Sequence, residues 1–363
     1  MAEFVDPDIT VASTIDSAFY RDEATYARAR ERIFGRTWQW IGDLADVADA
    51  GSLSPRELLR GLRDEPLLLS RDCVGTLRCL SNVCTHRGNI LIREPCTEAE
   101  QIRCGYHSRR FDLAGRMTFM PEFSAAKNFP SASDDLPQVP FAAWANHGFA
   151  ALDPVAPLET FLGEVATRLA WLPLAQFRPE PTLSRDYVMN AHWALYVENY
   201  LEALHIPFIH PALSRLIDYG SYEHELFRYS SLQLALVKEG ESAFDVPESA
   251  ADRGRQVGAY YWWIFPNLML NCYPWGLSLN HVVPEAIDRT RVEFRSYVWN
   301  ESKLRHGAGG ALHQVELEDE AIVEAVQRGV RSSFYRRGRY SPTRERGTHH
   351  FHRLLGEFLA GLP

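Results

Sequence analysis

The sequence predicts an α+β protein with two domains: an all-β domain, then a domain in which an antiparallel sheet wraps around a long C-terminal helix. Short apolar runs, punctuated by glycines, extend to about residue 150. A second series of β segments covers residues 227–299, and two helical stretches follow it. At 363 residues, the chain is long enough for two packed domains.

The expected elements follow in order along the chain. They are a helix over residues 23–34, a strand over 37–41, short strands to about 150, a linker at Pro154 and Pro157, a helix over 160–172 closed by Pro173, a strand from Tyr187, a helix from Trp193, a buried strand within 260–265 and an amphipathic helix over 315–330. We therefore expect a helical segment at residues 1–37 that packs on the second domain, a first domain at 38–150 and a second domain at 151–363.

The composition excludes several classes of function. With 46% hydrophobic and 23% charged residues, the chain resembles an ordinary globular protein, and it has no apolar run long enough to cross a bilayer. A net charge of -9 without a Lys/Arg block argues against nucleic acid or anionic lipid as partner. The first 13 residues lack the features of a secretion signal, so we expect a cytoplasmic protein. Four cysteines without metal-like spacing are expected to be reduced thiols: Cys73, Cys79, Cys96 and Cys272.

Two pairs of cysteine and histidine carry the strongest chemical signal. Cys84 and His86 are two positions apart, and Cys104 and His107, three apart, follow after seventeen intervening residues. Two thiolates on one iron and two imidazoles on the other form a 2Fe-2S cluster with a raised reduction potential, which serves as a one-electron relay. Zinc also accepts two cysteines and two histidines, but its sites usually space the pairs differently. The motif resembles that of the Rieske family and favours this cluster over zinc.

A second set of candidate ligands lies at Glu202, His205 and His210. Glu202 and His205 share a helix face, whereas His210 does not follow at about 100° per residue. Pro207 disfavours the α conformation at Ile206, so we expect a bend there that lets both imidazoles converge. Two histidines and one carboxylate form the facial set that binds non-haem Fe(II). Taken alone, the two histidines are better interpreted as core residues; the Rieske motif reverses that preference.

The third iron ligand is predicted on the amphipathic helix over residues 315–330. Asp319 falls near the middle of its apolar stripe and needs a partner there, which a metal provides. Glu318 and Glu320 point to either side and are expected to be solvated, although Glu318 remains the alternative ligand. A salt bridge to a buried arginine or a capping role is the competing interpretation of Asp319. The expected stripe consists of Val315, Ile322, Val323, Val326 and Val330.

Both constellations, in this order, look like the α subunit of a Rieske non-haem iron oxygenase, closest to the choline monooxygenase-like, aromatic-ring-hydroxylating group. The resemblance covers nearly the whole chain, including FGRTWQ at 34–39, FPNL at 265–268, VQRG at 326–329 and HFH at 350–352. The chain departs from the family at one place. Ser108, Arg109 and Arg110 stand where most members have Gly-Trp after the last cluster histidine. The departure leaves the cluster ligands intact. It affects only the surroundings of the cluster and the docking of other proteins near it.

The resemblance implies an all-β Rieske domain beside a helix-grip (START-like) catalytic domain, assembled as a head-to-tail homotrimer. In that family, the cluster of one chain serves the iron of its neighbour through a bridging carboxylate. Glu202 occupies the bridging position, between His205 and His107 of the partner subunit, where aspartate is commoner. Asn199 is expected to support the iron ligands without contacting the metal.

The family likeness implies a terminal oxygenase that uses O2, a 2Fe-2S cluster and mononuclear Fe(II) to hydroxylate or oxidatively demethylate a small organic substrate. The alternatives are an aromatic-ring cis-dihydroxylating dioxygenase, a Rieske electron carrier with a non-catalytic binding domain, and a zinc-stapled interaction protein. Without a nicotinamide or flavin motif, the chain requires a separate NAD(P)H-dependent reductase or a ferredoxin. Several aromatic residues could line the substrate pocket, although packing in the core is the more common role of such residues. They are Tyr260, Trp262, Phe265, Tyr273 and Trp275.

Overall fold

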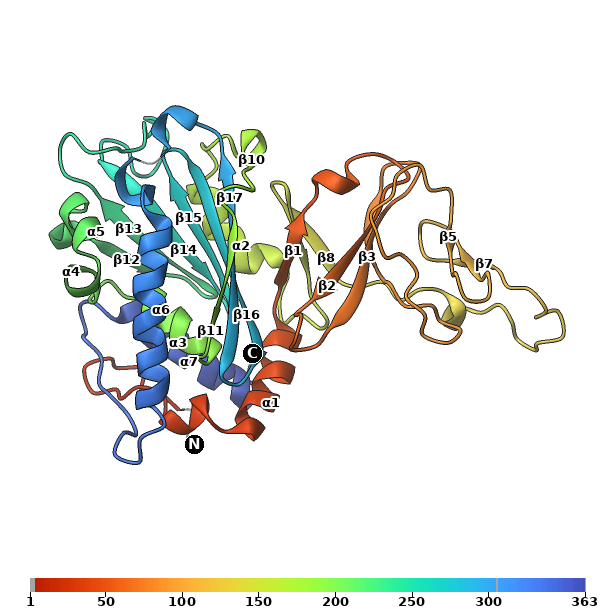
Figure 1. The fold of residues 1–363 in the computed structure, drawn as a ribbon, viewed down its shortest axis with the longest axis horizontal. Helices are drawn as coiled ribbons and strands as arrows, with labels where there is room; N and C mark the ends of the chain where they lie inside the picture. The colour runs from red at the N-terminus through yellow and green to blue at the C-terminus, as the bar shows by residue number, and fades with distance from the viewer. Residues whose placement is uncertain (1–3, 305, 363) are drawn as a thin grey trace. The chain divides into compact units, whose positions relative to one another are not determined.

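The computed structural model describes residues 4–304 and 306–362 (Figure 1). The chain divides into two compact units. One contains Trp38–Pro154, and the other joins the residues up to Thr37 with those from Val155 onward. No helix within the described ranges is both long enough and apolar enough to cross a membrane.

The Trp38–Pro154 unit consists of three small antiparallel sheets, with the strand orders β1-β9-β8, β2-β3-β4 and β5-β6-β7. Leu67, Leu68 and Leu69 of β3, the central strand of its sheet, are fully buried. Because successive side chains of a strand point to opposite faces, both faces are covered here. The all-β prediction is confirmed for these residues. The strands are β1 Gln39–Asp43, β2 Leu53–Leu58, β3 Glu65–Arg71, β4 Leu77–Ser81, β5 Ile102–Arg103, β6 Arg110–Phe111, β7 Met117–Phe119, β8 Phe141–Trp144 and β9 His147–Ala150.

The other unit is built on one antiparallel sheet with the order β10-β17-β16-β15-β14-β13-β12, and β11 also pairs with β17. From β12 to β17, each strand pairs with the next one along the chain, so the sheet is a meander of hairpins. This confirms the predicted α+β class and its series of β segments. The strands are β10 Arg178–Pro179, β11 Arg185–Met189, β12 Glu223–Leu226, β13 Ser230–Leu236, β14 Val257–Ile264, β15 Leu268–Tyr273, β16 Gly276–Ala286 and β17 Arg289–Val298.

Helices cover both faces of this sheet. In Figure 1, α3 and α6 lie in front of the strands and α2 lies behind them. Asp22 caps α1 by accepting from the Thr25 amide, and Gly361 ends α7 in the left-handed conformation. The helix expected over 160–172 begins two residues earlier and ends at Arg168. The helices are α1 Glu23–Arg32, α2 Leu158–Arg168, α3 Trp193–Tyr200, α4 Ile206–Ile209, α5 Pro211–Leu216, α6 Leu312–Gly329 and α7 Arg346–Ala360.

The buried face of α6 differs from the predicted apolar stripe. Val323 and Val330 are buried as expected, but Ile322 and Val326 are 36% and 42% exposed. The buried face instead includes Glu316 and Gln327. The stripe prediction was wrong for these positions because the inward face of α6 borders a cavity as well as the apolar core, and polar side chains are retained there.

Candidate metal centre and substrate cavity

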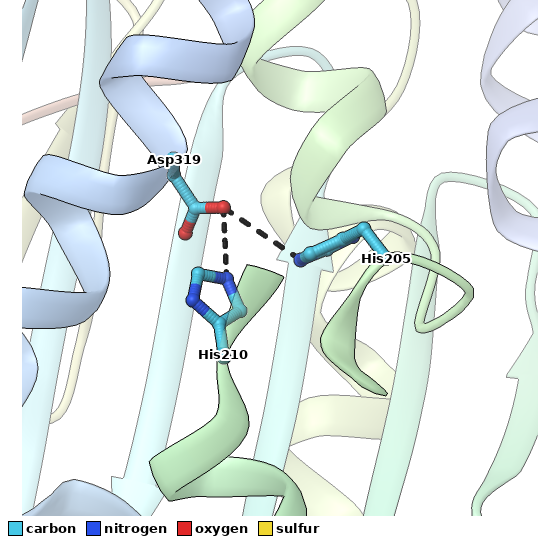
Figure 2. Close-up of side chains that lie close together, drawn as sticks. All are labelled: His205, His210 and Asp319. Carbon is cyan, nitrogen blue, oxygen red and sulfur yellow. Dashed lines mark hydrogen bonds and ion pairs between the residues drawn. The ribbon is translucent and has the colours of Figure 1, made fainter. Parts of the chain in front are cut away.

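His205, His210 and Asp319 converge on one point between α4 and α6 (Figure 2). The Asp319 Oδ1 atom lies 3.0 Å from His210 Nε2 and 3.6 Å from His205 Nε2. One ligand atom from each residue falls within 4.8 Å of the other two. Two imidazole nitrogens and one carboxylate oxygen at this spacing fit a facial non-haem iron site.

The backbone brings the two histidines together in a way that differs from the prediction. The helix does not bend at Ile206. Instead, α3 ends at Tyr200, and the short α4 begins at Ile206 with Pro207 in its first turn. Proline is tolerated there because the first amides of a helix have no intrahelical acceptor. His205 and His210 therefore flank a new four-residue helix, and the expected distortion by Pro207 was wrong.

Acidic side chains hold the far nitrogen of each imidazole. Glu202 Oε1 lies 2.6 Å from His205 Nδ1, and Glu318 Oε2 lies 2.7 Å from His210 Nδ1. A carboxylate in this position accepts the Nδ1 proton, fixes the ring and leaves Nε2 free for a metal. The expectation that Glu318 is merely solvated was wrong, because its side chain reaches around α6 to His210.

Asn199 and Asp319 interact directly. The Asn199 Nδ2 atom donates to Asp319 Oδ1 over 3.1 Å. Burial lowers the pKa of His210, but the hydrogen bonds and charges of Asp319 and Glu318 outweigh burial, and the net shift is upward. The site therefore favours a positive charge beside His210, as a metal-binding pocket should.

A cavity of about 100 Å³ opens from the three converging ligands. Tyr273 lines it, as expected, but Tyr260, Trp262, Phe265 and Trp275 do not, which corrects the prediction. Trp275 packs in a core cluster with Tyr273, and the Phe265 ring lies 4.7 Å from Phe358. The aromatic residues that line the cavity are Tyr196, Tyr200, Tyr222, Tyr261, Tyr273 and Phe294.

Glu316 is a buried acidic residue of the cavity wall that sequence reasoning missed. It is 3% exposed, and its Oε2 atom accepts from the Tyr196 hydroxyl over 2.8 Å. The Oε1 atom has no hydrogen-bond partner within the described chain. Burial raises the pKa of Glu316 well above its ordinary value, and the charges of Asp319 and Glu320 raise it further. The helical spacing of Glu316 and Asp319 could have revealed it, because residues three apart share a face.

The candidate cluster ligands lie on two loops with the same backbone geometry. The Cys84 amide donates to the carbonyl of Asn89, and the Cys104 amide donates to the carbonyl of Arg109, both over 2.8 Å. Gly88 and Ser108 occupy equivalent left-handed positions, with φ of 70° and 59°. Glycine adopts this conformation without strain, which is a physical reason for the glycine that most family members have at the position of Ser108.

The side chains of the two loops face one another. The Nδ1 atoms of His86 and His107 are 3.2 Å apart, and the two thiols are each 2% exposed. The side-chain amide of Asn89 donates from Nδ2 to Cys104 Sγ over 3.6 Å. Two buried thiols and two converging imidazole nitrogens fit a Rieske-type 2Fe-2S cluster.

Comparison with family models identifies the fold. Residues 174–361 match the ring hydroxylating alpha subunit (catalytic domain), and residues 37–130 match the Rieske [2Fe-2S] domain. The first match alone spans more than half of the chain. The chain belongs to the ring-hydroxylating α-subunit family. It is the terminal oxygenase component of a Rieske-type oxygenase, with a 2Fe-2S cluster, a mononuclear iron that uses O2, a small-molecule substrate and a separate reductase.

Individual proteins support the same assignment. The chain is 29% identical to chloroplastic choline monooxygenase of Arabidopsis thaliana, over 96% of this chain and 84% of that protein. It is 27% identical to the carnitine monooxygenase oxygenase subunit of Escherichia coli K12, over 95% and 94%. The predicted family, cofactors and oxygenase function are confirmed, and neither a zinc-stapled protein nor a non-catalytic electron carrier is supported.

Solved structures show the same fold. A quaternary ammonium Rieske monooxygenase in complex with L-carnitine aligns with a TM-score of 0.79 at 22% identity, over 99% of each chain. Naphthalene 1,2-dioxygenase from Rhodococcus sp. aligns with a TM-score of 0.73 at 18% identity, over 96% of this chain and 95% of that one.

Proposed function

We propose that this oxygenase hydroxylates or oxidatively demethylates a small organic cation. The observation that carries the substrate class is the unpartnered Oε1 atom of Glu316 in a cavity lined by tyrosines. Burial raises the pKa of this carboxyl group and so favours its protonated form, whereas a cationic ligand would stabilise the carboxylate. Aromatic faces attract the same kind of ligand through cation–π interactions. The names of the choline and carnitine relatives point to the same chemistry.

The size and position of the cavity support this substrate class. An apolar cavity of about 150 Å³ holds one benzene molecule, so about 100 Å³ suits a group the size of trimethylammonium. Glu316 precedes Asp319 by one helical turn, which places their Cβ atoms about 5–6 Å apart. A nitrogen held by Glu316 therefore keeps its attached carbon atoms beside Asp319.

We assign the metal ligands from the same geometry. Cys84, His86, Cys104 and His107 would hold the cluster, which supplies electrons one at a time when bound. His205, His210 and Asp319 would hold the mononuclear iron, which supplies the reduction of O2 and the oxidation of the substrate.

Other side chains orient the iron ligands. Glu202 and Glu318 keep the imidazoles in the tautomer with a free Nε2, and Asn199 orients the Asp319 carboxylate. Tyr196 holds Glu316 in the wall. The tyrosine rings exclude water from the substrate.

A pair of isosteric substrates tests the proposed class. Oxygen consumption and product formation are measured with a surrogate reductase, using choline and its uncharged carbon analogue 3,3-dimethyl-1-butanol. We expect turnover of the cation at a KM roughly 10- to 100-fold lower than that of the analogue, and loss of this difference in Glu316→Gln. Glu320→Gln, on the same helix but outside the cavity wall, should retain it. Equal use of both compounds by the wild type, or turnover of naphthalene but of neither compound, would overturn the proposal.

We also propose a homotrimer in which Glu202 links His205 to the cluster of the partner subunit. The proposal rests on the family resemblance and on the position of Glu202, whose carboxylate contacts His205 Nδ1 and the backbone amides of Leu204 and His205. A solved structure with this fold is described as revealing inter-subunit electron transfer.

Subunit complementation tests this arrangement. His107→Ala lacks a proposed cluster ligand, and Asp319→Ala lacks a proposed iron ligand, so each variant alone should be inactive. Assemblies that contain both variants, isolated through two different tags, should regain turnover, and sedimentation should show three chains. Mixed assemblies that remain inactive, although iron analysis shows both centres loaded, would contradict electron transfer between subunits.

A further inference from the structure

Arg109 places a buried guanidinium directly behind the cluster loops. It stands two residues after His107, at the end of the second ligand loop. The side chain is 2% exposed. Its guanidinium carbon lies 5.7 Å from the ring centre of Phe111 and 5.6 Å from that of Phe129. An arginine is rarely buried this completely unless its charge is paired or used.

The contacts of Arg109 reach both ligand loops. Its carbonyl oxygen accepts from the Cys104 amide over 2.8 Å, which closes the second loop. Its Nη2 atom donates to the Asp134 carbonyl over 3.1 Å, and the same carbonyl accepts from Thr85 Oγ1 over 2.7 Å. Thr85 stands between Cys84 and His86. Arg109 is therefore linked to the second ligand loop through its own backbone and to the first through the Asp134 carbonyl.

The charge of Arg109 is only partly balanced. Asp134 Oδ1 accepts from Nη2 over 2.7 Å, but the Asp134 side chain is 20% exposed, against 2% for the arginine. Water screens the carboxylate more than the guanidinium, because the latter has no solvent around it. The Arg109 Nε atom has no hydrogen-bond partner among the described residues. A net positive potential therefore extends inward, toward the ligand loops.

We propose that Arg109 raises the reduction potential of the 2Fe-2S cluster by holding an incompletely balanced positive charge beside its ligand loops. One-electron reduction adds one negative charge to the cluster, which a nearby buried cation stabilises. The reductase would then reduce this cluster more readily than one without the charge. This inference rests on the proposed assignment of Cys84, His86, Cys104 and His107 as cluster ligands.

Two substitutions with opposite signs test the proposal. The midpoint potential of the full-length, cluster-loaded protein is measured by dithionite titration with mediators, followed by visible absorption and electron paramagnetic resonance. Arg109→Met removes the charge and should lower the equilibrium constant for reduction at least about threefold. Asp134→Asn removes the balancing charge and should raise that constant. A tenfold change corresponds to about 59 mV for one electron.

Controls separate charge from structure. Arg109→Lys keeps the charge and should stay closer to the wild-type potential than Arg109→Met. Arg110→Met removes the neighbouring charge, which lies over the ring of Phe119, and should have less effect. A purely structural role of Arg109 predicts lower melting temperatures with no change in the midpoint potential. It could also shift the potentials of Arg109→Met and Asp134→Asn in the same direction. Either result would overturn the inference. If Arg109→Met does not retain its cluster, Asp134→Asn still decides. A wild-type protein without a Rieske signal would instead refute the ligand assignment.

Discussion

Three acidic residues on one turn of α6 have different roles because each meets a different partner. Asp319 faces the two imidazole Nε2 atoms, Glu318 reaches the outer nitrogen of His210, and Glu316 faces the cavity. Successive helical residues differ by about 100°, so neighbouring carboxylates on α6 meet different partners. The chemistry of the site is therefore set at the scale of single residues.

Glu318 should control how tightly iron is held. The hydrogen bond from His210 lowers the pKa of Glu318, so the side chain stays a carboxylate and orients the ring. Glu318→Gln should weaken iron binding roughly 10- to 100-fold, measured by chelator competition, with an unchanged cluster spectrum. Glu324→Gln, on the same helix but bonded to Asn190, is the matched control. Equal iron affinity in wild type and Glu318→Gln would show that His210 needs no such support.

At the scale of elements, the ligands depend on how closely two helices approach. The segment with Glu202 and His205 begins where α3 ends, and α7 passes directly beside it. A Cβ atom added at Gly347 of α7 would lie 2.4 Å from the carbonyl oxygen of Leu201. Since that contact is with backbone, the two segments would have to separate. Glycine at this position therefore allows the ligand-bearing turn to pack against α7.

Gly347→Ala should consequently damage both stability and metal binding. We expect a loss of about 1–3 kcal/mol in the free energy of unfolding, together with weaker iron retention, because the turn before His205 must shift. Thermal unfolding and iron analysis measure the two effects. Gly163→Ala on α2 is the control: its added Cβ would meet nothing within 4 Å, so stability should be unchanged or slightly higher. A Gly347→Ala protein as stable as this control would rule out the close approach.

At the scale of the whole molecule, buried neutral histidines limit acid stability. Burial lowers the pKa of His192 to about 3, and it is the main cause that lowers those of His147 and His350 to about 4. The unfolded chain binds these protons near pH 6.5. Stability is therefore fully present above pH 6.5 and is lost as the pH falls toward 4.

This loss should be measurable in each unit. Between about pH 6 and 4.5, each such histidine should destabilise its unit by roughly 1.4 kcal/mol per pH unit. His192 and His350 lie in the unit with the large sheet, whereas His147 lies in the Rieske unit. The stability of the unit with the large sheet should therefore fall more steeply as the pH is lowered. Denaturant unfolding at several pH values, followed by tryptophan fluorescence and by cluster absorption, measures this. His350→Gln should flatten the slope; an unchanged slope would show that His350 is already protonated in the native state.

The sequence alone determined the parts of this protein in which neighbours along the chain carry the information. The Cys84–His86 and Cys104–His107 spacings indicated the cluster, the recurring β segments indicated the fold class, and helical spacing separated Asp319 from its neighbours. These features depend on local geometry and on the resemblance that such motifs carry.

Only the tertiary structure decided which side chains meet across elements. It brought Glu318 to His210, left Glu316 without a partner for one oxygen, moved Trp262, Phe265 and Trp275 out of the expected pocket, and set Arg109 between the cluster loops. Periodicity gives the direction of a side chain relative to its own helix or strand. The partner on the other side depends on how the elements pack. Contacts between residues 25 to 120 positions apart in the sequence determine that packing.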